Sequence, residues 1–472
     1  MAASYSSERL ADRKPIVLIA GLCWNNGGLP PHRQRQRLPG AVISGPVSSG
    51  FRRQRSLFKA VPFAFFALAA LLCGMVSADE AALEWNGVPR IVAIGDLHGD
   101  YEQYLKVLTD AGLISKRGKW TGGDTHLVQT GDVTDRGPDS IAIIEHLEAL
   151  KKQARRKDGR VHTLIGNHEA MNSYGDLRYV HPGEYAHFTN RRSASLREMQ
   201  WDYTLAQLEQ TQAETLATLD LEQYRKEWEQ QYPLGWVEHR NAWMPDGEYG
   251  QWLLENPVAV MVNGSIFLHG GISASYCHMS LREMTDQAHQ ELRHFNPQAP
   301  GMIEDPMGPL WYRGLAEDDE QMLIPVVEAI LERYEAERIV VGHTPTGGVV
   351  WPRFQGRVVA NDTGIAAHYG GHEGFLEIVG DTAVAGYGDQ RLELPRDDAG
   401  REDYLKAVMA LQPGNELLAE RLQWLQSSAA GPSDSEAGAP PAEDEAGSAQ
   451  AQGAKAEASD AGAVGVSPDI CR

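Results

Sequence analysis

Between residues 90 and 180 the hydrophobic positions follow two alternating patterns. Short apolar runs, which read IVAIGD, HLVQTGD and VHTLIGN, are typical of buried strands. The stretches between them, YEQYLKVLTDAGLI and SIAIIEHLEALKKQARR, carry apolar residues at helical spacing. This order of strand, helix, strand, helix and strand predicts an α/β fold with a parallel sheet.

A second group of apolar runs follows residue 256. It reads VAVMVNGSIFLHGG, IVVGHTP, RVVANDTG and GFLEIVGDTAVAGYG, and each run has the length and composition of a strand. We expect these runs to form a second sheet that faces the first. Because polar motifs are distributed over both groups, the two sheets should belong to one catalytic domain, predicted over residues 79–427.

Residues 182–256 interrupt the strand pattern. They are rich in Gln, Glu, Arg and Trp, and their spacing is helical with mixed faces. One interpretation is a solvated helical insertion. The other is a lid beside the catalytic edge that shapes substrate entry, since long insertions at this position often determine specificity.

The two ends of the chain differ from the body in composition. After about Gln426 the sequence is dominated by Ala, Gly, Ser, Pro, Glu and Asp, which predicts a disordered acidic tail over residues 428–472. Four cysteines are too few for a disulfide scaffold. Since Cys471 lies in the predicted tail, a structural disulfide with Cys277 is not expected.

Residues 1–78 are predicted to be a leader. The run AVPFAFFALAALLCGMV follows a basic flank and precedes small residues, as in a secretory signal cleaved after Ala78. We expect an exported, periplasmic enzyme. An uncleaved membrane anchor and an Arg-rich organellar leader are the alternatives. Because signals seldom begin so late, we also expect translation to start downstream of Met1, near Val47.

Charge narrows the classes of partner. The formal net charge is −21, and residues 1–60 are basic, so the remainder is close to −29. An acidic surface of this size repels nucleic-acid phosphates, and we therefore expect no nucleic-acid partner. A phosphate substrate would have to be attracted by local positive charge in a cleft.

Five of the apolar runs end in polar motifs, which read GDLHGD, GDVTDRG, GNHE, HGG and GHTP. Functional residues of α/β folds collect at the carboxyl ends of strands. Carboxylate, imidazole and carboxamide groups without a thiolate suit two hard or borderline metal ions that hydrolyse phosphate esters. The candidate ligands are Asp96, His98, Asp132, Asn167, His269 and His343.

Asp132 is the candidate to bridge the two ions. A water shared by two dications becomes hydroxide near neutral pH, so the nucleophile needs no separate protein base. His168, next to Asn167, is the candidate general acid for the leaving group, and Asp135 is its candidate carboxylate partner or a helix N-cap. Glu169 is expected to support the site rather than to take part in the chemistry.

Two arginines are candidates to bind the phosphoryl oxygens. Arg136 lies in the GDVTDRG motif and Arg313 in GPLWYRG. A guanidinium group binds phosphate through two parallel hydrogen bonds. Arg313 has an alternative role, because it could instead stack on Trp311 and Tyr312.

Taken together, these motifs resemble the phosphoprotein phosphatase branch of the calcineurin-like metallophosphoesterases, from about Ile91 to Gly380. Within that branch, DLRYVHPGEYAHF, GPLWYRG, VVGHTPT and NDTGIAAHYGG look like the Shewanella-like protein phosphatases. The resemblance implies a four-layer α/β/β/α sandwich with a helical insertion. It also implies a dinuclear centre of manganese, with iron or zinc as alternatives. It assigns Asp96, His98 and Asp132 to one ion and Asp132, Asn167, His269 and His343 to the other.

The expected function is therefore hydrolysis of phosphoprotein esters, with phosphotyrosine as the substrate that the resemblance suggests. A phosphorylated protein or peptide is the expected partner, and a membrane is one only if the leader stays uncleaved. Two alternatives are a hydrolase of small molecules such as dinucleoside polyphosphates, and an inactive phosphoprotein-binding module. Because every expected ligand and His168 are present, the inactive module is the weakest of the three.

Overall fold

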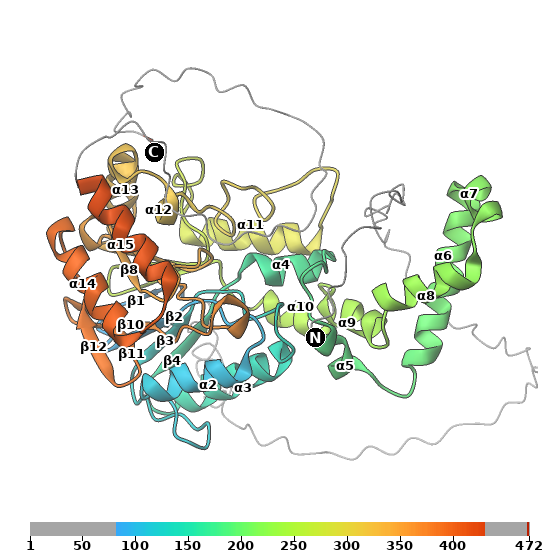
Figure 1. Cartoon of the computed structure of the whole chain (residues 1–472), viewed down its shortest axis with the longest axis horizontal. Coiled ribbons are helices and arrows are strands. Elements are labelled where there is room, and N and C mark those ends of the chain that lie inside the picture. The colour runs from blue at the N-terminus through green and yellow to red at the C-terminus, as the bar shows by residue number, and fades with distance from the viewer. Residues whose placement is uncertain (1–81, 430–469, 472) are drawn as a thin grey trace, which may run out of the picture. The chain divides into compact units, whose positions relative to one another are not determined.

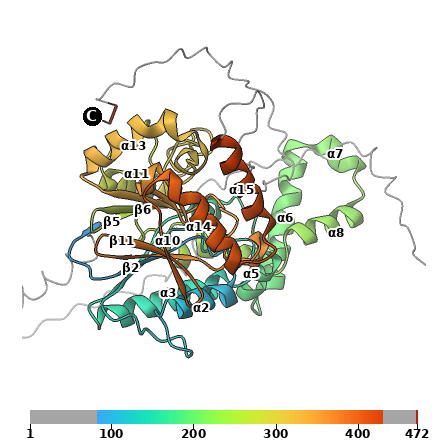
Figure 2. The same ribbon diagram turned by 60° about the vertical axis from the view of Figure 1, so that its left-hand side comes forward.

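The computed structural model describes residues 82–429, 470 and 471. Two six-stranded sheets face each other, and helices cover the outer side of each (Figures 1 and 2). This mixed α/β arrangement confirms the predicted fold class. The predicted leader lies outside the described residues, as does most of the predicted tail. In the part of the chain that is described, no helix is both long and apolar enough to span a bilayer.

The first sheet contains the strands predicted near the start of the domain. Its order is β12-β11-β10-β2-β3-β4. β2 (Ile91–Ile94), β3 (His126–Gln129) and β4 (Arg160–Thr163) are parallel, with Ile91 opposite His126 and His126 opposite Arg160. β10 (Phe375–Val379), β11 (Thr382–Tyr387) and β12 (Gln390–Glu393) continue the sheet in antiparallel fashion.

One strand assignment from the sequence was wrong. The run GFLEIVGDTAVAGYG was expected in the second sheet, but it forms β10 and β11 of the first, where Leu376 pairs with Ala93. The physical reason lies in β2. All four of its residues are buried, so this strand needs a partner on each side, and β10 covers the edge that β3 leaves open.

The second sheet has the order β1-β5-β6-β7-β9-β8. β6 (Ser265–Leu268), β7 (Arg338–Val341) and β9 (Val358–Ala360) are parallel, whereas β5 (Ala259–Val262) and β8 (Trp351–Arg353) pair antiparallel with β6 and β9. β1 (Glu84–Trp85) adds to the edge at β5. The β5–β6 turn is Asn263-Gly264, with φ of 46° and 70°, as a tight hairpin turn requires.

Helices cover both outer faces. α2 (Tyr101–Asp110) and α3 (Ser140–Arg155) lie on the first sheet, and α11 (Leu281–Arg293) and α13 (Glu320–Tyr334) lie on the second (Figure 2). The short helix α12 (Gly314–Glu317) contacts β9 of the second sheet. α14 (Asp398–Leu411) and α15 (Glu416–Ala429) pack together. The short helices are α4 (Asn167–Tyr174), η1 (Phe354–Gly356) and η2 (Ala367–Tyr369).

The interval 182–256 is helical. It contains α5 (Pro182–Phe188), α6 (Ser193–Thr211), α7 (Ala213–Thr218), α8 (Leu221–Gln231), α9 (Trp236–Trp243) and α10 (Glu248–Leu253). The tryptophans that stood out in the sequence pack on each other here. Trp201 contacts Trp228, and Trp228 stacks on Tyr232, so a local aromatic cluster holds α6 against α8.

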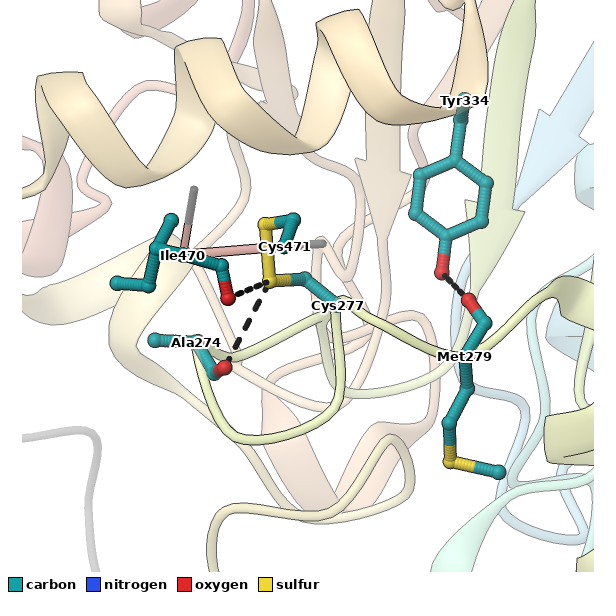
Figure 3. Close-up of a disulfide and its surroundings, with 6 residues drawn as sticks. All are labelled: Ala274, Cys277, Met279, Tyr334, Ile470 and Cys471. Carbon is teal, nitrogen blue, oxygen red and sulfur yellow. Dashed lines mark hydrogen bonds between the residues drawn. A yellow bond between two sulfur atoms is a disulfide. The ribbon is translucent and has the colours of Figure 1, made fainter. Parts of the chain in front are cut away.

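A disulfide joins Cys277 to Cys471, across 194 residues of sequence (Figure 3). The expectation that no such bond forms was therefore wrong. Cys277 lies in the loop after β6, fully buried, and the Ile470-Cys471 pair packs against that loop and the core. Ile470 packs an apolar side chain against the core, although the composition of the tail as a whole is polar.

The disulfide should contribute measurably to stability. Because it closes a long loop in the unfolded chain, replacing Cys471 by Ser should lower the free energy of unfolding by about 2–4 kcal/mol. Chemical denaturation without reductant measures this loss. Dithiothreitol should destabilise the parent protein and leave the Cys471→Ser variant unchanged. A parent midpoint that does not respond to reductant would contradict the expectation.

Candidate active site

The polar motifs meet at one edge of the two sheets. Asp96, Asp132 and Asn167 follow β2, β3 and β4, and His269 and His343 follow β6 and β7. The sheets are joined there directly, because the backbone N–H of His343 donates to Asp96 Oδ1 over 3.2 Å. The carboxyl ends of five parallel strands thus bring the predicted ligands together.

Asp132 lies at the centre of this group. Its Oδ2 is 3.2 Å from His269 Nε2 and 3.9 Å from His98 Nε2. His98 Nε2 is also 3.9 Å from Asp96 Oδ2, and Asn167 Oδ1 is 2.8 Å from His269 Nε2. All six predicted ligands are at most 4% exposed. The structure therefore places the whole predicted set within one buried cluster.

Two overlapping groups have the spacing of a metal site. One contains His98, Asp132 and His168, and the other contains Asp132, His269 and His343. Asp132 belongs to both, as a bridging carboxylate would. The first group includes His168, which the sequence assigned to acid catalysis, so this imidazole lies close enough to that site to interact with whatever binds there.

The imidazoles are oriented by backbone carbonyls. His98 Nδ1 lies 2.9 Å from the carbonyl oxygen of Thr134, and His269 Nδ1 lies 2.9 Å from that of Thr130. Each Nδ1–H donates to the carbonyl, so Nε2 faces the cluster with its lone pair. His343 Nε2 is buried and has no hydrogen-bond partner among the residues that the structure describes. Such an atom is a suitable ligand for a cation.

Electrostatics favour the same chemistry. Burial lowers the pKa of His98 to about 3, and burial together with the charge of Arg313 lowers that of His343, so both imidazoles are neutral ligands at pH 7. Burial, then the neighbouring Asp362 and Asp132, raises the pKa of Asp96. Burial opposes ionisation of Asp132, but the neighbouring imidazoles of His269 and His168 lower its pKa, so Asp96 is the ligand carboxylate that needs an added cation to stay ionised. The donor set therefore fits divalent metal ions.

The backbone at the site is strained. Five of the ten non-glycine residues with positive φ in the described chain are predicted site residues, namely His98, Asp132, Asp135, Arg136 and His343, with φ between 42° and 71°. Such conformations concentrate at functional sites, where the surrounding structure enforces them. At the neighbouring Gly166 a Cβ would lie 2.1 Å from Asp132 Oδ1, so only glycine allows this approach.

Glu169 supports the turn that carries Asp132. This fully buried carboxylate accepts hydrogen bonds from the backbone N–H groups of Asp132, Val133, Thr134 and Gly166, over 2.8–3.0 Å. The hydroxyl of Thr134 donates to it as well. Its supporting position agrees with the sequence-based expectation for Glu169.

His168 is oriented by hydrogen bonds that involve Asp135 and Asn172. Its Nδ1 is 2.6 Å from Asp135 Oδ2, and the Asn172 amide donates to Asp135 Oδ1 over 2.9 Å. Burial opposes protonation, but the charge of Asp132 and the hydrogen bond to Asp135 together raise the pKa of His168 to about 9. A protonated imidazole beside the cluster can donate a proton to a leaving group.

The two arginines lie on different sides of the site. Arg136 follows Asp135 directly, and its guanidinium lies 4.0 Å above the ring of Tyr179. Arg313 donates to the carbonyl oxygen of His343 over 2.6 Å and lies 3.4 Å from Thr344 Oγ1. Arg313 is thus anchored to a ligand loop and not stacked on its neighbours Trp311 and Tyr312. Both positions are compatible with the predicted phosphate clamp.

Three residues near the site were not found from the sequence. Asp362, in the NDTG motif, is buried beside Asp96, and burial raises its pKa to about 6. Asn172 positions Asp135, and Tyr179 contacts both His168 and Arg136. The motifs NDTG and DLRYV were visible in the chain, but nothing in their composition indicated which side chain would turn toward the candidate ligands.

Comparisons with known proteins agree with this geometry. The profile of the calcineurin-like phosphoesterases matches residues 89–347, and the chain belongs to that family. An uncharacterized protein of Schizosaccharomyces pombe is 33% identical over 63% of this chain and 79% of its own length. The family sets the class of reaction, the cleavage of phosphate esters.

Within the family, the similarity extends to a smaller group. Shewanella-like protein phosphatase 2 of Arabidopsis thaliana is 31% identical over 54% of this chain, which spans only 66% of that relative. The crystal structure of a cold-active protein-tyrosine phosphatase from a psychrophilic Shewanella species matches with a TM-score of 0.50 and 26% identity. That match covers 67% of this chain and 85% of the other. The resemblance to Shewanella-like protein phosphatases is thereby confirmed.

Loss of the central carboxylate should remove the metals. The Asp132→Asn variant should retain less metal after desalting and lose at least about 100-fold in phosphatase rate, because the amide removes the charge shared by both groups. Metal per chain, measured by plasma mass spectrometry, checks this. Asp158→Asn, an exposed residue with a similar φ of 61°, is the matched control. Parent-like metal content in Asp132→Asn would refute the ligand assignment.

Proposed function

We propose that this protein is a dinuclear metal-dependent phosphomonoesterase that hydrolyses phosphoprotein esters. The observation that carries the proposal is the hydrogen-bonded pair of His168 and Asp135 beside Asp132, with the Arg136 side chain next to it. A ligand cluster alone would suit several reactions. An acid and a guanidinium beside the cluster suit transfer of a phosphoryl group away from an alcohol or a phenol.

Each residue has a defined part in this proposal. Asp96, His98, Asp132, Asn167, His269 and His343 would hold two divalent ions, manganese first, with iron or zinc as alternatives. When bound, the ions supply charge neutralisation and an activated water. Arg136 and Arg313 orient the phosphoryl oxygens. His168 gives its proton to the leaving oxygen, while Asp135 holds the imidazole in position.

Phosphotyrosine is the proposed substrate, supported by the likeness to the Shewanella tyrosine phosphatase. Turnover of phosphotyrosine, phosphoserine and phosphothreonine peptides by the manganese-loaded protein, beside diadenosine tetraphosphate, tests this choice. Turnover of the peptides supports a protein phosphatase. Turnover of the dinucleotide alone would favour the alternative function, a hydrolase of dinucleoside polyphosphates.

The role of His168 predicts a dependence on the leaving group. In His168→Asn, hydrolysis of phenyl phosphate should fall about 10²–10⁴-fold, because phenoxide needs a proton. Hydrolysis of p-nitrophenyl phosphate should fall much less, since nitrophenolate leaves without one. Steady-state rates on both esters, with Asp135→Asn as an intermediate case, measure the difference. Equal losses on the two esters would rule out the acid role.

We also propose that the protein is exported to the periplasm, with a membrane-anchored or organellar location as the alternatives. The disulfide supports this, because such bonds persist in oxidising compartments and are rare in the cytosol. Subcellular fractionation, with mass spectrometry of non-reduced peptides, tests the proposal. A cytosolic protein with free thiols at Cys277 and Cys471 would contradict it.

A further inference from the structure

The segment that leads into the helical insertion lies against the predicted catalytic residues. Residues 175–181 connect α4 to α5, and within them the ring of Tyr179 contacts two predicted catalytic groups. The guanidinium carbon of Arg136 lies 4.0 Å from the centre of this ring, and the imidazole of His168 lies 5.1 Å from it at a tilt of 45°. The acid and the clamp are therefore both in contact with one aromatic side chain.

The backbone fixes this arrangement. The N–H of Arg136 donates to the carbonyl oxygen of Tyr179 over 3.0 Å, while Arg136 itself has a φ of 63°. Glu184, in the first turn of α5, accepts from the N–H of Ser140 over 2.6 Å. The segment that carries Tyr179 is thus hydrogen-bonded to the 136–140 turn at two points. These bonds hold the backbone that carries the ring to that turn.

The insertion holds the catalytic helix from a second side. Arg240, in α9, donates to the carbonyl oxygen of Asn172 over 2.8 Å, at the end of α4. Because α4 begins with Asn167 and His168, a contact at its end restrains the residues at its start. The connecting segment thus contacts His168 and Arg136, and the insertion itself contacts the helix that carries His168. The sequence suggested a lid or a solvated insertion. These contacts indicate that this region also supports the helix that carries His168.

We propose that Tyr179 is a positioning residue that holds Arg136 and His168 in place for catalysis. This inference rests on the proposed phosphomonoesterase function. An arginine side chain has several rotatable bonds, and ordering it on phosphate binding costs free energy. A ring under the guanidinium pays that cost in advance through a cation–π contact. The hydroxyl of Tyr179 has no part in this role.

If Tyr179 has this positioning role, two substitutions at this residue should have different effects. Tyr179→Phe keeps the ring, and should keep kcat, KM and the inhibition constant of inorganic phosphate within about twofold. Tyr179→Leu removes the ring, and should raise both KM and the phosphate inhibition constant about tenfold, as loss of a half-buried cation–π contact predicts. Tyr203→Leu, an exposed tyrosine of α6, is the matched control and should resemble the parent. Metal content should be unchanged in all three.

A double-mutant cycle tests whether Tyr179 acts through Arg136. If it does, Tyr179→Leu should add little to the phosphate affinity already lost in Arg136→Ala. Fully additive losses would overturn the proposal, as would a Tyr179→Phe variant as weak as Tyr179→Leu. Should the leucine variant melt below the assay temperature, Tyr179→Met provides the same comparison.

Failure of the proposed function is distinguishable from failure of this inference. Calorimetric titration of the manganese-loaded protein with inorganic phosphate measures the contribution of Tyr179 without any turnover. Inactivity of the parent enzyme on every phosphate monoester would refute the function. Equal phosphate affinity in the parent and Tyr179→Leu would refute the inference alone.

Discussion

The site depends on one buried carboxylate, that of Glu169. It accepts hydrogen bonds from three successive backbone N–H groups of the turn after β3 and from Gly166 at the start of α4. Burial and the charge of Asp132 raise the pKa of Glu169, and the backbone N–H groups satisfy its oxygens in this position. Through these bonds the turn that carries Asp132 and the helix that carries His168 become one unit. The positive φ of Asp132 is maintained because the hydrogen bonds to Glu169 hold the backbone of this turn in place.

The two sheets are also coupled to each other at the site. Four of the five strands that end at the site, β2, β3, β6 and β7, are short and almost wholly buried, so their positions are set by packing on both faces. The candidate ligands follow the last residue of each strand, and there Asp96 accepts from His343 of the other sheet. Movement of either sheet would therefore disturb ligands supplied by both. This coupling explains how residues separated by nearly 250 positions can be held to hydrogen-bonding accuracy.

Much of this could be predicted from the sequence, because strand, helix and ligand motifs are local patterns. The apolar runs that became β2, β3 and β4, and all six candidate ligands, lie where the periodicity placed them. Long-range pairing carries no such local signal. The register of β10 on β2 depends on which edge of β2 remains unpaired. The Cys277–Cys471 bond joins residues 194 positions apart, and Ile470 is the one apolar residue beside Cys471 that could have indicated it. Tyr179 could not be found either, since its role lies in two contacts made by a loop.

The buried carboxylates at the site require compensating positive charge. Most of the chain is acidic, and the cluster adds Asp96, Asp132 and Asp362 in full burial, which is costly without compensation. The imidazolium of His168 supplies one positive charge for three carboxylates, and the neutral His98 does not supply that compensation, since burial lowers its pKa to about 3. Two dications would, and they would also leave a local surplus of positive charge beside Arg136 and Arg313. A phosphate ester would then meet local positive charge at this edge, although the chain as a whole is acidic.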